Sequence, residues 1–270
     1  MKKKFFLFIA ALLFSGNVTG SENIRLPNIR SMALGGNGVM FSTEYNPAIL
    51  SYQKSKILDI SYINRYMVKE LGTVSLGFQY PNDKLSTGLY ISSFGYDEYR
   101  ETMFRAAFAK SLGEHWSLGI AFQYYILQSA LYEHTPSRLS TDIGAVYSPV
   151  EKLSIGLLIK DFPSVSVNKE STDNEILKYW DFLLGFKYDV INNTLISFYC
   201  GTDSEYRLTG GIGMEYLVKD IFHIRGGLCI APLLPSFGFG IRLKSFSIDT
   251  SVIYHSVLGA SLGAGLSFHF

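Results

Sequence analysis

The dominant pattern in this 270-residue chain is a strict alternation of apolar positions with small or polar ones. In the last segment the apolar positions are Ala260, Leu262, Ala264, Leu266, Phe268 and Phe270, and the positions between them are Ser261, Gly263, Gly265, Ser267 and His269. A period of two indicates β-strands with one apolar face. The same alternation recurs in runs of about 9 to 11 residues or slightly more, the length that a tilted strand needs to cross a membrane.

This pattern predicts fourteen strands. They are expected near 56–67, 71–81, 85–94, 101–112, 115–129, 138–148, 152–161, 178–190, 193–203, 206–218, 220–230, 236–244, 245–254 and 260–270. Even-numbered strands end in tight polar turns, of which Asn82-Asp83-Lys84 and Gly113-Glu114 are examples. Longer links, expected at 94–100, 130–137, 162–177 and 231–235, fall on the opposite side.

An even strand number, with short turns on one rim and longer loops on the other, is typical of an outer-membrane β-barrel. We therefore predict an all-β fold, a transmembrane antiparallel barrel over 56–270, in the outer membrane with both termini in the periplasm. The alternative is a soluble sandwich or lipocalin-like barrel with its apolar face inward. That alternative calls for more charge on the other face than this chain carries.

Composition supports an apolar outer surface. Hydrophobic residues make up 47% of the chain and aromatic residues 15%, but charged residues only 17%, against about 25% in an average soluble domain. The formal net charge is +1, so no nucleic-acid partner is predicted. Outer-membrane lipid is the expected surrounding.

The N-terminus has the form of an export signal. Lys2 to Lys4 are followed by an apolar run from Phe5 to Phe14 and by the small residues of Val18-Thr19-Gly20. This order predicts a signal peptide over 1–20 with cleavage after Gly20. The alternative, a membrane anchor, needs about 20 apolar residues.

Charged residues occur sparsely, and with both signs, in the polar phase of the strands. They are Arg105, Asp142, Asp181, Lys187, Arg207, Glu215, Arg225, Arg242 and Asp249. Because Arg or Lys facing lipid at the membrane midplane costs about 2–4 kcal/mol, we expect these side chains to face the lumen. Two interpretations remain open: a lattice of mutual salt bridges that fills the barrel, or a substrate-selective charged pore.

The segment 21–55 shows no alternation and is predicted to be a compact plug. Gly35 and Gly36 permit tight turns, and Asn46 followed by Pro47 and Ala48 suits a helix cap with proline at the first helical position. A fourteen-stranded barrel is wider than the eight-stranded type that side chains alone can fill. The alternative is a flexible periplasmic tail, which would leave the apolar residues of this segment exposed.

The C-terminus and the remaining motifs complete the prediction. Leu266, Phe268 and Phe270 are expected to form the insertion signal for the outer-membrane assembly machinery. Gly259 to Gly263 fits Gly-x-Ser-x-Gly, but that catalytic elbow needs a strand, a turn and a helix. The five histidines are scattered and the two cysteines are expected to be free, so we predict no enzyme, no metal and no cofactor.

One motif carries a resemblance. Arg30 to Gly36, followed by Asn46 to Leu50 and then by the first strand, resembles the N-terminal signature of the PorV/PorQ family, which is related to FadL-type barrels. The resemblance implies fourteen strands and an N-terminal hatch. It implies a non-enzymatic envelope component of type IX secretion and surface attachment in Bacteroidetes-type bacteria, which binds secretion-system proteins.

The alternative that the resemblance implies is a FadL-like channel for hydrophobic ligands, with a movable hatch and a side opening to lipid. The sequence favours the first. An apolar lumen pocket lined by Phe and Leu would favour the second.

Overall fold

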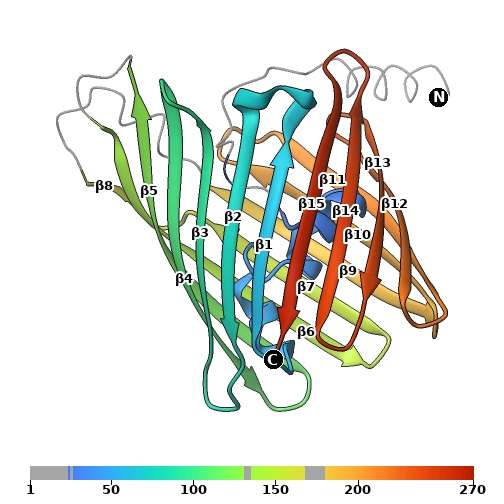
Figure 1. Cartoon of the computed structure of the whole chain (residues 1–270). Helices are drawn as coiled ribbons and strands as arrows, with labels where there is room; N and C mark the ends of the chain where they lie inside the picture. Colours follow the sequence, from blue (N-terminus) through green and yellow to red (C-terminus); the bar gives the residue numbers. More distant parts are fainter. Residues whose placement is uncertain (1–23, 25–26, 131–134, 168–179) are drawn as a thin grey trace, which may run out of the picture.

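The chain forms a closed antiparallel β-barrel with an N-terminal segment inside it (Figure 1). The computed structural model describes residue 24 and residues 27–130, 135–167 and 180–270. The expected signal peptide, 1–20, lies outside the described residues. Among the described residues no helix is long and apolar enough to cross a membrane.

The barrel wall is one sheet in which neighbouring strands are mostly consecutive in sequence. Its strands are β1 (Ile57–Asn64), β2 (Gly72–Tyr80), β3 (Ser86–Tyr96), β4 (Tyr99–Leu112), β5 (Trp116–Ser129), β6 (Ser137–Val150), β7 (Leu153–Lys160), β8 (Ser164–Ser166), β9 (Asp181–Ile191), β10 (Thr194–Asp203), β11 (Leu208–Val218), β12 (Phe222–Cys229), β13 (Leu234–Arg242), β14 (Phe246–His255) and β15 (Gly259–His269). β1 pairs with both β2 and β15, which closes the ring.

Fourteen of these fifteen strands form the ring, because β8 pairs only with one end of β6. The predicted fold class is therefore confirmed, and every predicted strand is present within a few residues. β8 was not predicted, since three residues are too few to show alternation. The long link expected at 94–100 was wrong: β3 and β4 continue to Tyr96 and from Tyr99, and a tight hairpin with Gly95 at φ 103° joins them.

Short turns gather at the end of the barrel where Phe270 lies (Figure 1). We call this end the turn rim and the other the loop rim. The turn rim carries the links at 81–85, 113–115, 151–152, 192–193, 219–221 and 243–245. The loop rim carries the links at 65–71, 97–98, 204–207, 230–233 and 256–258.

Strand register places the apolar phase on the outside. Ile60 is paired with Leu76 on one side and with Leu266 on the other, and the alternate positions face the lumen. Large hydrophobic side chains on the outward face are exposed, for example Leu89 and Met214. Such a belt is stable in a bilayer, where lipid covers it.

The N-terminal segment contributes three short helices: α2 (Ile29–Ala33), α3 (Gly38–Phe41) and the 3-10 helix η1 (Pro47–Tyr52). An asparagine side chain caps each of them, and the caps are Asn28, Asn37 and Asn46. We call residues 27–52 the lumen segment, because its helices contact the inward faces of strands on opposite sides of the ring. Two further 3-10 helices, η2 (Arg65–Met67) and η3 (Lys69–Leu71), join β1 to β2.

Candidate functional site

The lumen segment is wedged between opposite walls, and glycines in the walls make the room. A Cβ at Gly227 of β12 would lie 2.2 Å from the Gly35 nitrogen, and one at Gly213 of β11 would lie 2.5 Å from the Leu34 oxygen. On the other side, a Cβ at Gly119 of β5 would lie 2.4 Å from the Ala48 nitrogen. These are sub-van-der-Waals distances to backbone atoms. The glycines of the polar phase are therefore required for the segment to fit.

The predicted motif residues of the segment lie at these contacts. Gly35 has φ 71° and Gly36 has φ 90°, in the left-handed region that favours glycine. The Asn46 Oδ1 accepts a hydrogen bond from the Ala48 nitrogen at 3.1 Å, and its Nδ2 donates to the Val39 oxygen at 2.8 Å. The first bond is the predicted cap ahead of Pro47, and the second ties η1 to α3.

One ionic cluster joins the lumen segment to the wall. Arg30 of α2 donates to both carboxylate oxygens of Glu215 on β11, at 2.9 and 2.6 Å. Arg225 of β12 donates to the same carboxylate at 2.5 Å and also to Asp249 of β14. Gly240 leaves space for that second bond, because a Cβ there would lie 2.6 Å from the Arg225 guanidinium. We call Arg30, Glu215, Arg225 and Asp249 the segment clamp.

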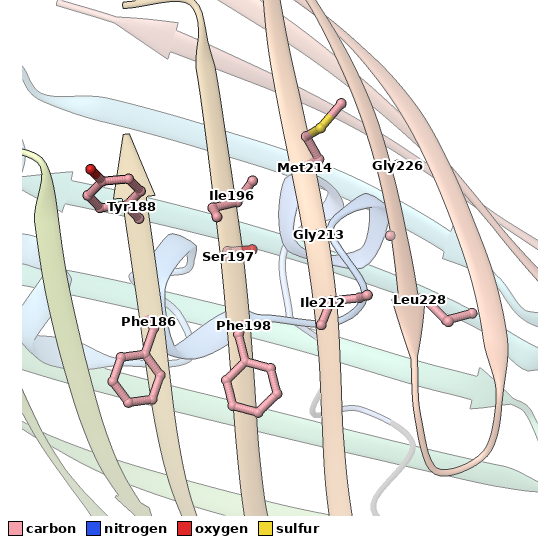
Figure 2. Close-up of a pocket in the computed structure, with 11 residues that line it drawn as sticks. Phe186, Tyr188, Ile196, Ser197, Phe198, Ile212, Gly213, Met214, Gly226 and Leu228 are labelled. Atoms are coloured by element: carbon pink, nitrogen blue, oxygen red, sulfur yellow. The ribbon is translucent and has the colours of Figure 1, made fainter. Parts of the chain in front are cut away.

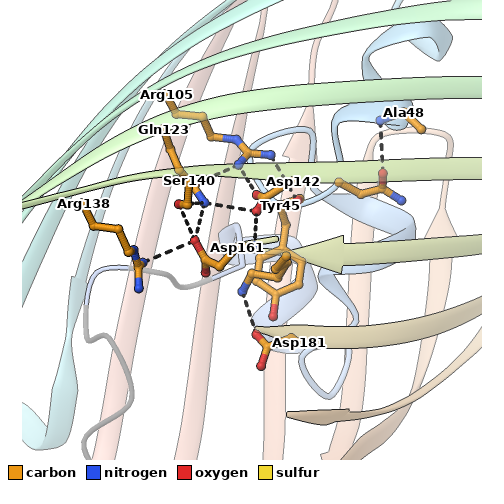
Figure 3. A network of polar contacts seen from close by, with 11 residues as sticks. Tyr45, Ala48, Arg105, Gln123, Arg138, Ser140, Asp142, Asp161 and Asp181 are labelled. Carbon is orange, nitrogen blue, oxygen red and sulfur yellow. Dashed lines mark hydrogen bonds and ion pairs between the residues drawn. The ribbon is translucent and has the colours of Figure 1, made fainter. Parts of the chain in front are cut away.

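A second ionic cluster lies within the opposite wall and is drawn in Figure 3. We call it the wall network, and its members are Arg105, Gln123, Arg138, Ser140, Asp142 and Asp161. Asp142 accepts from Arg105, from Gln123 at 3.0 Å and from the Asp161 backbone nitrogen at 2.8 Å. Asp161 accepts from Ser140 at 2.6 Å and pairs with Arg138 at 3.3 Å. From the lumen segment, the Tyr45 carbonyl accepts a hydrogen bond from Arg105 at 3.3 Å.

Most predicted lumen charges therefore occur in two clusters. Asp181 pairs separately with Lys160 at 3.4 Å, Lys187 pairs with Asp189 at 3.0 Å, and Arg242 lies at the last position of β13. The placement of Arg207 in a strand was wrong: it lies in the turn before β11 and pairs with Asp203 at 2.7 Å. Its loop-rim turn keeps it outside both clusters.

Three charged residues of these clusters, and Glu44 of the lumen segment, escaped sequence reasoning. Arg30 lies outside the predicted strands, and Asp161, the last residue of the strand predicted at 152–161, falls in the apolar phase of that strand, so periodicity marks neither as lumen-facing. Arg138 was passed over at the start of a strand, and its side chain is 1% exposed. Glu44, between α3 and η1, accepts from Ser92 of β3 at 2.9 Å, and burial raises the pKa of its carboxyl to about 7.

Near the loop rim, the inward face of β3 to β5 is apolar. Phe94, Met103, Tyr125 and Leu127 form a buried cluster there with Ile24, which precedes the lumen segment. Leu71 and Tyr99 pack at its edge. We call this packed group of side chains the inner cluster.

A second apolar site lies on the outward face of the barrel, as Figure 2 shows. This outer hollow has a volume of about 470 Å³ and is lined by Phe186, Tyr188, Ile196, Phe198, Ile212, Met214 and Leu228, among others. Gly226 opens it, since a Cβ there would have no neighbour within 4 Å. The hollow lies on the outer face of the barrel wall and does not belong to the lumen.

The predicted insertion signal lies at the turn rim. Leu266 and Phe268 pair with apolar outward positions of β14, and Phe270 is 73% exposed with its backbone nitrogen bonded to the Lys56 oxygen at 3.0 Å. A role in assembly stays a prediction. Among the described residues no group of His, Cys, Asp and Glu could hold a metal ion, and the Gly259–Gly263 stretch opens β15.

Comparison with known proteins shows the fold through solved structures only. No family model matches the chain, and no curated protein matches it in sequence. The CymD monoaromatic hydrocarbon channel is similar with a TM-score of 0.65 at 11% identity, over 93% of this chain and 99% of that one. The Pseudomonas putida toluene transporter TodX gives 0.64 at 10% identity, over 92% and 99%.

A Pseudomonas aeruginosa FadL homologue gives a TM-score of 0.53 at 12% identity, over 91% of this chain and 97% of the other. These neighbours share the fourteen-stranded FadL-type outer-membrane barrel, and the chain has that fold. The resemblance to FadL-type barrels is thus supported at the level of fold. The finer assignment to PorV/PorQ is not supported by any of these comparisons.

Proposed function

We propose that the protein is a FadL-like channel that admits small hydrophobic compounds through the outer membrane, with the lumen segment as its plug. The inner cluster, an apolar stretch of the lumen wall, is the observation that carries this proposal. Its lining of Phe94, Tyr125 and Leu127 is the apolar lumen site expected of a hydrocarbon channel and not of a water-filled pore. Neighbours described as a monoaromatic hydrocarbon channel and a toluene transporter have the same fold.

The FadL-like channel, which was the alternative in the sequence-based prediction, is now preferred to the role in type IX secretion. The role in type IX secretion rested on the motif around Gly35 and Asn46, and the described contacts of that motif all serve the fit of the segment inside the barrel. In the proposed orientation the turn rim and both termini are periplasmic and the loop rim faces outward. The protein works without catalysis.

The test exploits a contact between η1 and the wall. The Ser51 and Ser117 hydroxyl oxygens lie 2.6 Å apart, close to the roughly 2.05 Å of a disulfide bond. The double variant Ser51→Cys, Ser117→Cys, with Cys200→Ser and Cys229→Ser, should lock the segment to β5. Uptake of radiolabelled toluene is then measured in cells that lack other channels of this kind.

We expect the oxidised variant to take up toluene several-fold more slowly than the reduced one, with the Cys200→Ser, Cys229→Ser barrel as the matched control. Uptake that does not depend on the protein would contradict a channel function. Uptake that depends on the protein but is equal in the oxidised and reduced variants would mean that the channel works while the Ser51 end of the plug stays fixed to β5.

A further inference from the structure

The outer hollow is a trench across four strands, β9 to β12 (Figure 2). Strand register places two parallel rows of outward side chains along its edges. Read from β9 to β12, one row is Tyr188, Ile196, Met214 and Gly226, and the other is Phe186, Phe198, Ile212 and Leu228. Between the rows, the floor is formed by the backbone of Ser197, Gly213 and Gly227. The trench therefore has two apolar walls and a narrow floor without outward side chains.

Gly226 is the short position in these walls. On β12 its outward neighbours are Ile224 and Leu228, and its register partners on the adjacent strands are Met214 and Phe237. A Cβ at this glycine would have no neighbouring heavy atom within 4 Å. The trench is therefore open here because a side chain is missing, and large apolar groups surround the opening.

The fold itself does not require glycine at this position. The φ angle of Gly226 lies outside the left-handed region that favours glycine, and the register with both neighbouring strands runs through it without a bulge. The next residue differs, because a Cβ at Gly227 would lie 2.2 Å from the Gly35 nitrogen. A glycine inside a strand often marks a bulge or a site where a ligand or another backbone approaches closely. With no bulge and no backbone near Gly226, a ligand is the remaining reason.

The dimensions of the trench select a linear chain. Its two rows are two residues apart along the strands, which is about 7 Å, and four strands span about 14 Å at about 4.8 Å per spacing. An α-helix with its side chains is about 10–12 Å wide, too wide to enter between the rows. The volume of about 470 Å³ lies within the roughly 300–1,000 Å³ of small-molecule sites. A single extended hydrocarbon chain therefore fits the trench lengthwise.

The membrane around the barrel supplies such a chain. The trench is continuous with the belt of exposed apolar side chains that lipid covers in an outer-membrane barrel. In lipid no hydrophobic force distinguishes one apolar surface from another, so association depends on van der Waals packing. A chain in the trench gains contacts on both sides and below, whereas a chain on the flat belt gains them on one side only. We therefore expect an acyl chain to stay longer here than elsewhere on the wall.

Tyr188 indicates the leaflet from which the chain comes. It lies three residues before β9 ends at the turn rim, and Leu228, at the other end of the trench, lies one residue before β12 ends at the loop rim. Tyrosine favours the membrane interface, because its ring is apolar and its hydroxyl polar. A lipid with its head group at the turn rim can place that head group next to the Tyr188 hydroxyl and its chain in the trench.

We propose that the outer hollow is a binding site for one acyl chain of a phospholipid from the leaflet at the turn rim. Gly226 opens the site, and the Phe186 and Phe198 rings, with centroids 6.1 Å apart, form part of one wall. The site does not depend on the channel function. A barrel that transports nothing would bind the chain equally well.

A photoreactive lipid tests the site. The full-length protein is placed in nanodiscs of phosphatidylethanolamine that contain a small share of the same lipid with a diazirine in the middle of one acyl chain. After illumination, mass spectrometry maps the labelled residues. We expect labelling of Phe198, Met214 and Leu228 to exceed several-fold the labelling of Ile60 and Leu76, which face outward on β1 and β2.

Two variants fill the gap to different degrees. Gly226→Leu should reduce labelling of the trench several-fold, and Gly226→Ala should give a value between this variant and the parent protein. Because a Cβ at position 226 meets no neighbour, both variants should keep the heat-modifiable mobility of the parent. Ala264→Leu is the matched control, since it adds bulk on the outward face of β15, where Ala264 pairs with Tyr62 and Thr250. It should leave labelling of the trench unchanged.

Two competitors identify the occupant. Unlabelled lysophosphatidylethanolamine has only one chain and should protect the trench from labelling as well as the unlabelled two-chain lipid does. Toluene at the same concentration should protect it much less. Protection by toluene that equals protection by the lysophospholipid would assign the hollow to small hydrocarbons and overturn the proposal.

Even labelling of the whole apolar belt, or labelling of the trench that is unchanged in Gly226→Leu, would also overturn it. Sedimentation equilibrium in detergent gives the remaining check. A parent protein that is a dimer, and a Gly226→Leu variant that is a monomer, would show that a second copy of the chain occupies the hollow in place of lipid. Toluene uptake enters none of these measurements, so the channel function and the lipid site fail separately.

Discussion

The wall network and the segment clamp use the same kinds of residue for different purposes. In the wall network the side chains all come from β4 to β6 and from Asp161 just after β7, and they bond to one another. In the segment clamp, one member, Arg30, belongs to the lumen segment. The wall network therefore stabilises the barrel wall, and the segment clamp holds the lumen segment in place.

Burial also separates Arg30 from the wall network. The side chains of Arg105 and Asp142 are each 1% exposed, whereas that of Arg30 is 23% exposed. Breaking a fully buried ion pair by removing one partner leaves an uncompensated charge, but a partly exposed partner can be replaced by water. The comparison teaches that barrel stability and retention of the segment can be changed independently.

The largest effect is expected from Asp142→Leu. This change leaves Arg105 buried without its carboxylate and should lower the free energy of unfolding by about 3–5 kcal/mol. Denaturant titration of the barrel in micelles, followed by tryptophan fluorescence, gives this value. The double variant Arg105→Leu, Asp142→Leu removes both charges and should recover part of the loss. Equal or greater loss in the double variant would argue against a buried ion pair.

Arg30→Leu should act on the segment and spare the barrel. It removes a charge-assisted contact worth about 1.5–3 kcal/mol, while Glu215 keeps Arg225 as a partner at 2.5 Å. We expect the segment to become at least about tenfold more sensitive to added protease, with barrel unfolding changed by under about 1 kcal/mol. Outward-facing Leu89→Ala serves as control. A loss of barrel stability like that of Asp142→Leu would erase the distinction between the clusters.

The third effect depends on pH. Burial raises the pKa of Glu44 from its ordinary 4.5 to about 7, opposed by the Ser92 hydrogen bond and the Arg105 charge and assisted by the Asp59 charge. Glu44 holds its proton more tightly when the lumen segment is packed in the barrel than when it is released. Packing of the segment in the barrel is therefore strongest below pH 4.5 and weakens as pH rises through about 7. Protease sensitivity of the segment should therefore increase from pH 5 to pH 8.

Glu44→Gln is the matched control, since it cannot titrate and keeps the size of the side chain. Its protease sensitivity should change much less over that range. If the variant showed the same pH dependence as the parent protein, another group would be responsible.

The smallest effect is expected from Asn46→Ala. It removes the cap of η1, worth about 1 kcal/mol, and the bond to the Val39 oxygen. The segment should be released slightly more often, and protease sensitivity at pH 5 measures this. Asn28→Ala, at the cap of α2, provides a comparison, because its Oδ1 accepts from the Ser31 nitrogen at 2.9 Å. No change in either variant would mean that wall contacts alone hold the helices.

Alternation was enough to predict the barrel. Lipid outside and a packed lumen inside impose a period of two on every strand, so strand number and position follow from the sequence. The tight hairpin between β3 and β4 was missed because β3 runs on to Tyr96 and β4 begins at Tyr99, inside the link predicted at 94–100.

The candidate site was only partly predictable. Sequence phase placed Arg105, Asp142, Glu215, Arg225 and Asp249 in the lumen, but their partners depend on strand register and barrel shear, which the phase does not contain. Arg30 and Asp161 gain their importance from neighbours distant in sequence. The inner cluster likewise brings together residues of three strands and of the N-terminal segment, which no local motif can reveal.

The central claim, that the lumen segment closes the channel, is tested most directly by conductance in planar bilayers. The intact protein is compared with a deletion of residues 23–50, which removes Arg30, the glycine turn and the Asn46 cap together. We expect little current from the intact protein and a clear ohmic current from the deletion, because a fourteen-stranded cylinder without its contents admits water. An intact protein that already conducts as strongly as the deletion would contradict the account.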